Sequence, residues 1–164
     1  MIVVGIDPGT IIMGYGVIES RNDTVSMVKY GSFNTTSRSP IGERLSFLYK
    51  NLMQIMLEFQ PQAVAVEQPF VAKNAQSAFA VGRAQAVAIL AAANCKINCF
   101  EYTPREVKMR VANYGASSKD QIQQMVMLQL GLSQIPEPAD AADALAVALC
   151  HLQAMRTQEL LNQE

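Results

Sequence analysis

The sequence contains no tryptophan, a single histidine (His151) and three cysteines (Cys95, Cys99 and Cys150). The cysteines are odd in number and lack C-x-x-C spacing, which is typical of reduced thiols in the cytosol and argues against a disulfide framework. One histidine without paired thiolates also excludes an ordinary zinc site. We expect His151 on a helix surface or near a helix C-terminus, where it would interact with the dipole, and not as a metal ligand.

Long apolar runs are missing as well. No stretch approaches the ~18 residues that cross a bilayer. The first residues carry neither a basic segment nor a cleavage site, so we expect no signal peptide and a cytoplasmic protein. Half of the residues are hydrophobic and 16% are charged, which excludes disorder. The length of 164 residues predicts one domain over residues 1–156 and a short C-terminal tail over residues 157–164.

The net charge is −1, which taken alone counts against nucleic-acid binding. The charge is nevertheless unevenly distributed. Residues 70–119 carry seven basic and two acidic side chains, a net charge of +5, and the remainder carries −6. Phosphate backbones are attracted by local basic patches, so the basic segment is compatible with nucleic-acid binding. The alternative is that its basic side chains lie on ordinary solvent-exposed helix surfaces.

Short runs with strand character occur early and in close succession. The predicted strands are Ile2–Asp7, Met13–Glu19, Val25–Phe33, Ala63–Glu67 and Ile97–Tyr102. Glycines at positions 14, 16 and 31 mark bulges or places of close approach. Three consecutive strands predict an antiparallel meander, and the later ones alternate with helices.

Helical periodicity dominates after the third strand. The first predicted helix has Ser39 as its N-cap and Pro40 as its first residue. Further helices start at Asn74, at the Thr103–Glu106 capping box, at Ser117 and at Glu137, and the last one ends near Met155. Strands and helices together imply an α/β fold with a five-stranded mixed sheet flanked by helices.

Two of the predicted strands end on an acid. "VVGID" ends in Asp7 and "AVAVE" ends in Glu67. If these strands are parallel neighbours, both carboxylates emerge at the carboxyl edge of the sheet, where open α/β sheets place ligands. Asp140 and Asp143 share one face of the last helix. Each acid alone is most simply a cap or a surface group, but four converging carboxylates would repel one another and favour divalent cations.

Several residues between positions 70 and 119 suit nucleic acid. Phe70 follows Glu67 closely and could stack on an unpaired base, although a core phenylalanine is the simpler reading. Lys73 and Arg83 suit phosphates. Lys119 lies in the first turn of a helix, where a cation opposes the dipole, which hints at a role other than stability.

Four segments together resemble the RuvC family of Holliday-junction resolvases. These are "GIDPGT…GYGVI", "AVEQPFVAKNAQSA", "EYTPREVK…GASSKDQIQQMV" and "DAADALAVALCH", which occur in the family's order over about residues 2–152. The resemblance implies a ribonuclease-H-like fold and a homodimer that nicks two opposing strands of a four-way DNA junction, leaving 5′-phosphate and 3′-hydroxyl ends. It also implies the branch-migration proteins RuvA and RuvB as partners.

The resemblance also assigns site residues. Asp7, Glu67, Asp140 and Asp143 match the family's catalytic acids, which bind two Mg²⁺ ions, with Mn²⁺ as an alternative. Phe70, Lys108 and Lys119 match residues that contact the junction. The predicted DNA-binding set is Phe70, Lys73, Asn74, Arg83, Lys108 and Lys119.

The sequence departs from the family pattern at two places. Ile11, Ile12 and Met13 follow "DPGT" where a basic residue and a threonine are common, and Asn113 replaces a frequent glycine before "YGA". Because asparagine tolerates a left-handed conformation, we expect the second turn to survive. Two alternatives stay open: an actin-like phosphate-binding ATPase or kinase domain, and a catalytically silent junction-binding module.

Overall fold

Strand β1 (Ile2–Asp7) lies at the centre of a sheet with the order β3-β2-β1-β4-β5. β2 (Ile12–Arg21) and β3 (Thr24–Asn34) continue the sheet on one side as antiparallel neighbours. β4 (Ala63–Glu67) and β5 (Asn98–Tyr102) lie parallel on the other side. The predicted mixed sheet with its antiparallel meander is therefore confirmed in this computed structural model, which describes residues 1–22, 24–69 and 75–162.

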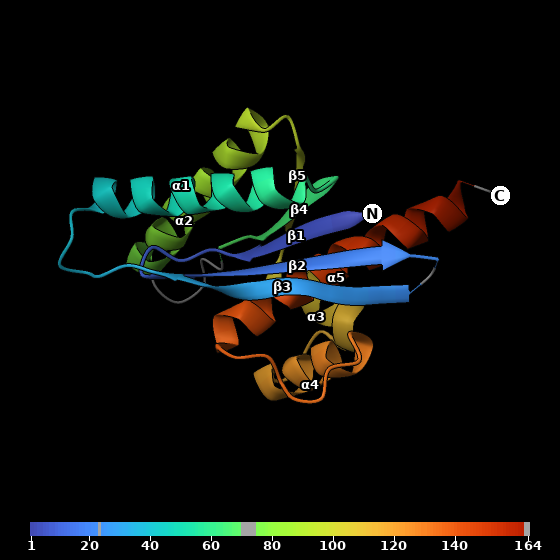
Figure 1. Cartoon of the computed structure of the whole chain (residues 1–164). Coiled ribbons are helices and arrows are strands. Elements are labelled where there is room, and N and C mark those ends of the chain that lie inside the picture. The colour runs from blue at the N-terminus through green and yellow to red at the C-terminus, as the bar shows by residue number, and fades with distance from the viewer. Residues whose placement is uncertain (23, 70–74, 163–164) are drawn as a thin grey trace.

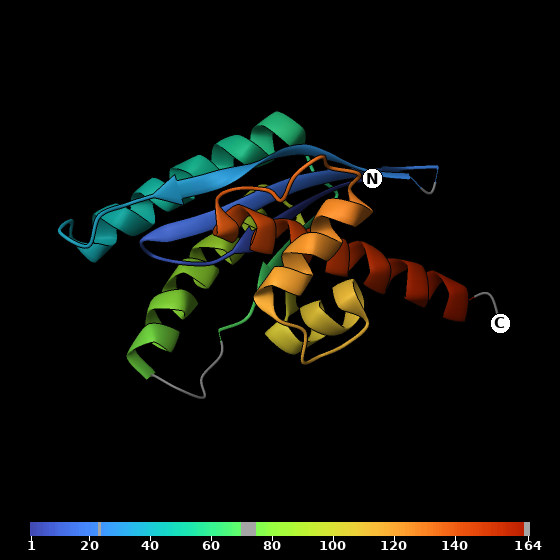
Figure 2. The same ribbon diagram turned by 90° about the horizontal axis from the view of Figure 1, so that it is seen from below.

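Helices cover both faces of the sheet (Figure 1). α1 (Ile41–Phe59) and α2 (Ala75–Asn94) lie on one face. α5 (Ala139–Leu161) crosses the other face, and α3 (Pro104–Ala112) and α4 (Lys119–Gln129) pack against it from outside (Figure 2). Among the described residues, no helix combines the length and hydrophobicity that a membrane crossing requires.

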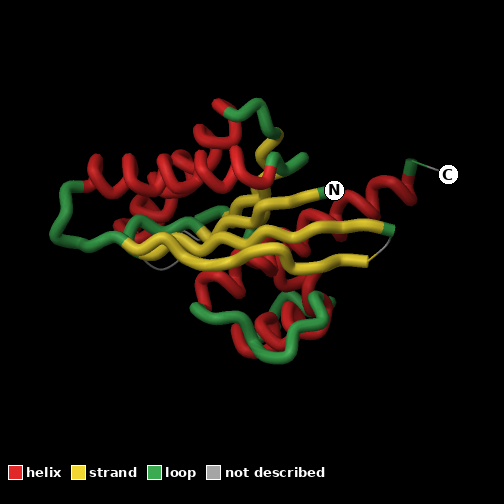
Figure 3. Tube along the Cα trace, in the orientation of Figure 1, coloured by secondary structure: helices red, strands yellow, loops and turns green. Residues whose placement is uncertain are grey.

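Side-chain alternation along β1 divides the interior into two cores, one on each side of the sheet. The helices that cover the two sides are seen in the trace of Figure 3. Val3 packs with α3, α4 and α5, whereas Val4 and Ile6 pack with α1 and α2. Since successive strand residues point to opposite faces, Asp7 falls on the same face as Val3, which is the face covered by α5. Glu67 has the same relation to Ala65 in β4.

α5 touches the sheet backbone because the facing strand positions are glycines. A Cβ atom at Gly14 would overlap the carbonyl oxygen of Asp140, and one at Gly5 would overlap that of Ala144. The close approach predicted at Gly14 is thus confirmed. Buried between the sheet and two further helices, α5 is enclosed on nearly all sides from residue 141 to residue 152, where every residue except Asp143 is buried.

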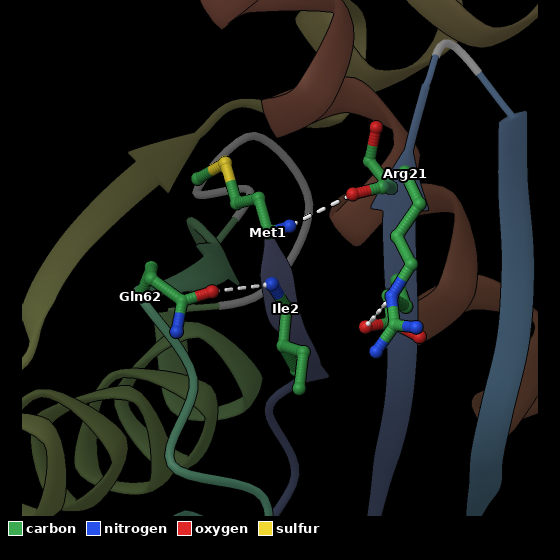
Figure 4. Close-up of polar contacts among 6 residues, drawn as sticks. Met1, Ile2, Arg21 and Gln62 are labelled. Atoms are coloured by element: carbon green, nitrogen blue, oxygen red, sulfur yellow. Dashed lines mark hydrogen bonds and ion pairs between the residues drawn. The ribbon is translucent and has the colours of Figure 1, made fainter.

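Two hydrogen bonds hold the amino-terminal end of β1 (Figure 4). The amino group of Met1 donates to the carbonyl oxygen of Ser20 over 2.8 Å, and the Ile2 amide donates to Gln62 Oε1 over 2.5 Å. These bonds tie β1 to the end of β2 and to the residue before β4. They support the register that pairs Ile6 with Val66.

Several helix limits differ from the sequence prediction, and α5 begins at Ala139 instead of Glu137. Pro40 takes an extended conformation, so it is the N-cap of α1 and not its first residue. Ser118 rather than Ser117 caps α4, because the Ser118 hydroxyl accepts the Gln121 amide while that of Ser117 donates to Tyr114. α5 continues to Leu161, so residues 157–161 of the predicted tail are exposed helix.

We expect Gly14→Ala to lower the free energy of unfolding by about 1–3 kcal/mol, the usual cost of overpacking, because α5 must move away from the sheet. Gly82→Ala is the matched control: Gly82 lies in α2 with open space around it, and alanine favours a helix. Urea denaturation measures both. Equal stability of Gly14→Ala and the parent chain would contradict the close contact.

Candidate active site

Asp7 and Glu67 lie next to each other at one edge of the sheet. The parallel register pairs Ile6 with Val66, so the two acids occupy the following position of each strand. Both side chains are partly buried. The predicted convergence of the two strand-end carboxylates is therefore present in the fold.

α5 adds two more acids to the same edge. Gly14 pairs with Asp7 across β1 and β2, and the backbone of Asp140 lies directly on Gly14. Asp143 follows Asp140 by three residues, about one helical turn, and therefore lies on the same face of α5. The glycine contact thus places the start of α5 beside the end of β1.

The acids lie close enough to shift one another's pKa values. Burial, followed by repulsion from Asp143 and Asp140, raises the pKa of Asp7 from 3.8 to about 7. Burial, followed by repulsion from Asp7 and Asp143, raises the pKa of Glu67 from 4.5 to about 7. At neutral pH neither carboxyl is therefore fully ionised in the folded chain without a neighbouring cation.

Lys119 partly neutralises the acids. Its Nζ lies 2.6 Å from Oδ2 of Asp143, and this hydrogen bond is the main cause of a raised pKa of Lys119. The pKa of Asp143 is nevertheless raised, because burial outweighs the attraction of Lys119. A lysine at the start of a helix opposes the dipole, but here the ion pair compensates for that cost.

A cavity of about 220 Å³ opens beside this group. Glu67, Asp143, Lys108 and Lys119 contribute its charged lining. The capping boxes of α3 and α4, at Thr103 and Ser118, define where the helices that carry the two lysines begin. Acids and cations from four separate elements therefore face one space.

The acids provide oxygen donors that suit a divalent cation. Hard cations such as Mg²⁺ prefer carboxylate oxygens, and the raised pKa values of Asp7 and Glu67 are a cost that such a cation would relieve. In the described part of the chain, however, no three acidic, histidine or cysteine side chains already form a ligand group. Lys119 forms an ion pair with Asp143, so its ammonium group and a metal cation would compete for that carboxylate.

The other predicted residues are placed as follows. Phe70, Lys73 and Asn74 lie outside the described residues. Arg83 lies on α2, where it lines a groove with Phe79, and it does not line the cavity beside the acids. Asn113 adopts the expected left-handed conformation, with φ of 54°, after α3.

The surface position expected for His151 is wrong. Its side chain is 1% exposed, Nδ1 lies 2.8 Å from the Tyr102 hydroxyl, and the ring packs on Phe100. Burial lowers the pKa of His151. An enclosed helix shows no periodicity that would distinguish an inner from an outer position, and for this reason the sequence pattern could not locate this residue.

Sequence reasoning also missed the support of the Asp-Pro-Gly-Thr turn. Thr35 Oγ1 donates to the carbonyl oxygen of Thr10 over 2.6 Å, and Arg44 Nη1 reaches Thr10 Oγ1 at 3.4 Å. Three residues after this turn depart from the family pattern. Of these, Met13 is fully buried, whereas Ile11 and Ile12 are 37% and 42% exposed. No local signal links residues 10 and 44, which only the fold brings together.

Comparisons with known proteins agree on one family. The family model described as crossover junction endodeoxyribonuclease RuvC matches residues 3–151. The crossover junction endodeoxyribonuclease RuvC of Dehalococcoides mccartyi strain 195 is 52% identical over 151 residues, which cover 92% of each chain. The structure of Thermus thermophilus RuvC in complex with a Holliday junction substrate superposes with a TM-score of 0.91, at 32% identity and 96% coverage of both chains.

The raised pKa values predict a pH-dependent stability without metal. Between pH 4 and about 7 the folded chain holds protons on Asp7 and Glu67 that the unfolded chain releases, so stability falls as pH rises through this window. Asp7→Asn removes the burial cost of that charge. We expect this variant to raise Tm at pH 8 in EDTA by about 2–4 °C for each kcal/mol regained.

The gain should shrink toward pH 4.5, where Asp7 of the parent chain is protonated. Thermal denaturation at both pH values measures the difference, and Glu159→Gln, an exposed position on α5, is the control. A gain for Asp7→Asn that is equal at both pH values would contradict the assignment of the raised pKa.

Proposed function

The chain belongs to the RuvC family of crossover junction endodeoxyribonucleases, and on this premise we propose that it resolves four-way (Holliday) DNA junctions. The reaction is hydrolysis of one phosphodiester in each of two opposing strands, which leaves 5′-phosphate and 3′-hydroxyl ends. The observation that carries the proposal is the convergence of Asp7, Glu67 and Asp143 with two lysines at one sheet edge.

We assign Asp7, Glu67, Asp140 and Asp143 as the catalytic acids that hold the metal, most simply two Mg²⁺ ions, with Mn²⁺ able to substitute. When bound, these cations supply Lewis-acid stabilisation of the attacking and leaving oxygens of the phosphodiester. Release of Lys119 from Asp143 would free both groups, the carboxylate for a cation and the ammonium for a phosphate. The apolar walls of the cavity, Val107 and Ile122 among them, would limit access of bulk water.

The DNA-contacting residues are proposed from the family motifs and from their charge. Lys108 and Lys119 would contact phosphates close to the cut, because both line the cavity beside the acids. Phe70, Lys73, Asn74 and Arg83 would contact the junction along the segment that follows Glu67. We assign this chain to the cytoplasm, where recombination and repair of DNA take place.

A homodimer suits the substrate, because two identical sites related by a twofold axis can address two opposing strands of a junction. RuvA and RuvB are the proposed partners that move the branch point. Neither an ATPase nor a silent binding module accounts for the clustered acids as simply as a metal-dependent nuclease does.

In Mg²⁺, the purified chain should convert a synthetic four-way junction into paired nicked duplexes. We expect Asp7→Asn to slow cutting by roughly 10²–10³-fold or more, because a carboxylate that is proposed to hold the metal is lost. Binding of the junction should be kept. Gel analysis of end-labelled junctions measures both. Hydrolysis of ATP without junction cutting would instead support the actin-like alternative, and normal cutting by Asp7→Asn would refute the acid assignment.

Lys119→Ala should weaken junction binding and reduce the slope of log K against log salt by about 0.7–0.9, the contribution of one phosphate contact. Binding is measured by titration in the Asp7→Asn background, so that no cutting interferes. Lys50→Ala, an exposed lysine of α1, is the matched control. An unchanged salt slope in Lys119→Ala would show that Lys119 does not contact a phosphate.

A further inference from the structure

A second cavity lies beside the turn that follows Asp7. It has a volume of about 410 Å³ and is bordered by the end of β3, the loop over residues 35–40 and the first turns of α1. Most residues that border it have polar side chains with hydroxyl, amide or guanidinium groups, and the others are one acid and one phenylalanine: Asn34, Thr35, Thr36, Ser39, Glu43, Arg44 and Phe47. None of these residues lines the cavity beside the acids.

Hydrogen bonds fix this cavity relative to the proposed active site. The Thr35 amide donates to the carbonyl oxygen of Ile11 over 2.8 Å, and the Thr35 hydroxyl donates to that of Thr10 over 2.6 Å. Thr10 lies three residues after Asp7. The loop between β3 and α1 therefore lies at the sheet edge where β1 ends, as Figure 3 shows on the left of the molecule.

Arg44 brings positive charge to a turn that has none. Residues 8–13 contain no charged side chain, and the Arg44 guanidinium approaches them through Nη1, 3.4 Å from Thr10 Oγ1. Its Nε is buried and has no hydrogen-bond partner among the described residues. This N–H therefore lacks an acceptor, and a buried N–H donor without one is unfavourable.

We infer that this cavity binds a phosphate of the DNA strand that flanks the cut, with Arg44 as the principal contact. The inference rests on the proposed function. Arginine, threonine, serine and asparagine side chains are the usual donors to DNA phosphates, and all four types line the cavity. The N-cap residue of α1, Pro40, makes no side-chain hydrogen bond to the first turn, so the positive end of the helix dipole adds to the attraction.

Among the described residues that line the cavity, Glu43 is the one that opposes an anion, and it makes the inference sharply testable. If a phosphate binds there, Glu43→Gln removes a repulsion and tightens binding, an effect that structural damage does not mimic. Arg44→Ala should do the opposite. Both are made in the Asp7→Asn background and titrated with a four-way junction at several salt concentrations.

We expect Glu43→Gln to tighten junction binding at least twofold. Arg44→Ala should weaken it about three- to tenfold and reduce the salt slope by about 0.7–0.9, whereas Arg44→Lys should retain most of the slope. Glu159→Gln and Arg21→Ala are the matched controls, since Glu159 is exposed near the far end of α5 and Arg21 is 77% exposed at the far end of β2.

Should Arg44→Ala disturb the fold, Thr36→Glu and Thr36→Gln test the same cavity from an exposed position. Only the glutamate variant should weaken binding. Normal junction binding with an unchanged salt slope in Arg44→Ala, or no gain in Glu43→Gln, would overturn the inference and leave the proposed function intact. Failure of the Asp7→Asn parent to bind the junction would refute both.

Discussion

The backbone contact between α5 and the β1–β2 pair is the constraint on which the rest of the structure depends. Gly5 and Gly14 have no side chain to separate the helix from the sheet, so the carbonyl groups of Ala144 and Asp140 rest directly on the strands. This contact sets the depth of α5 and encloses it beneath α3 and α4. It also brings the first turn of α5 to the strand end that carries Asp7.

Close packing of acids is unfavourable unless their charge is compensated. Burial and mutual repulsion raise the pKa values of Asp7 and Glu67 to about 7, and Lys119 at the start of α4 forms an ion pair with Asp143. The contact that positions the acids thus brings negative charges together, and a nearby positive charge would stabilise them. In the proposed reaction, a divalent cation would supply this positive charge.

Much of the fold and of the candidate site could be predicted from local pattern. Apolar runs that end in Asp7 and Glu67 correctly placed both acids at one sheet edge, because parallel strands share their carboxyl ends. The Thr103 capping box was confirmed for a similar reason, since its hydrogen bonds lie within one turn. His151 was misplaced because burial on all sides of α5 leaves no periodicity to read.

The sequence by itself determined which segments form strands and helices, the order of the elements and which acids end the central strands. These properties depend on side-chain alternation, helical period and capping, all of which act over a few neighbouring residues. Only the tertiary structure decided that Lys119 pairs with Asp143 and that Arg44 reaches Thr10. Each of those contacts joins residues far apart in the chain, and a local pattern shows which face is buried but not what lies against it.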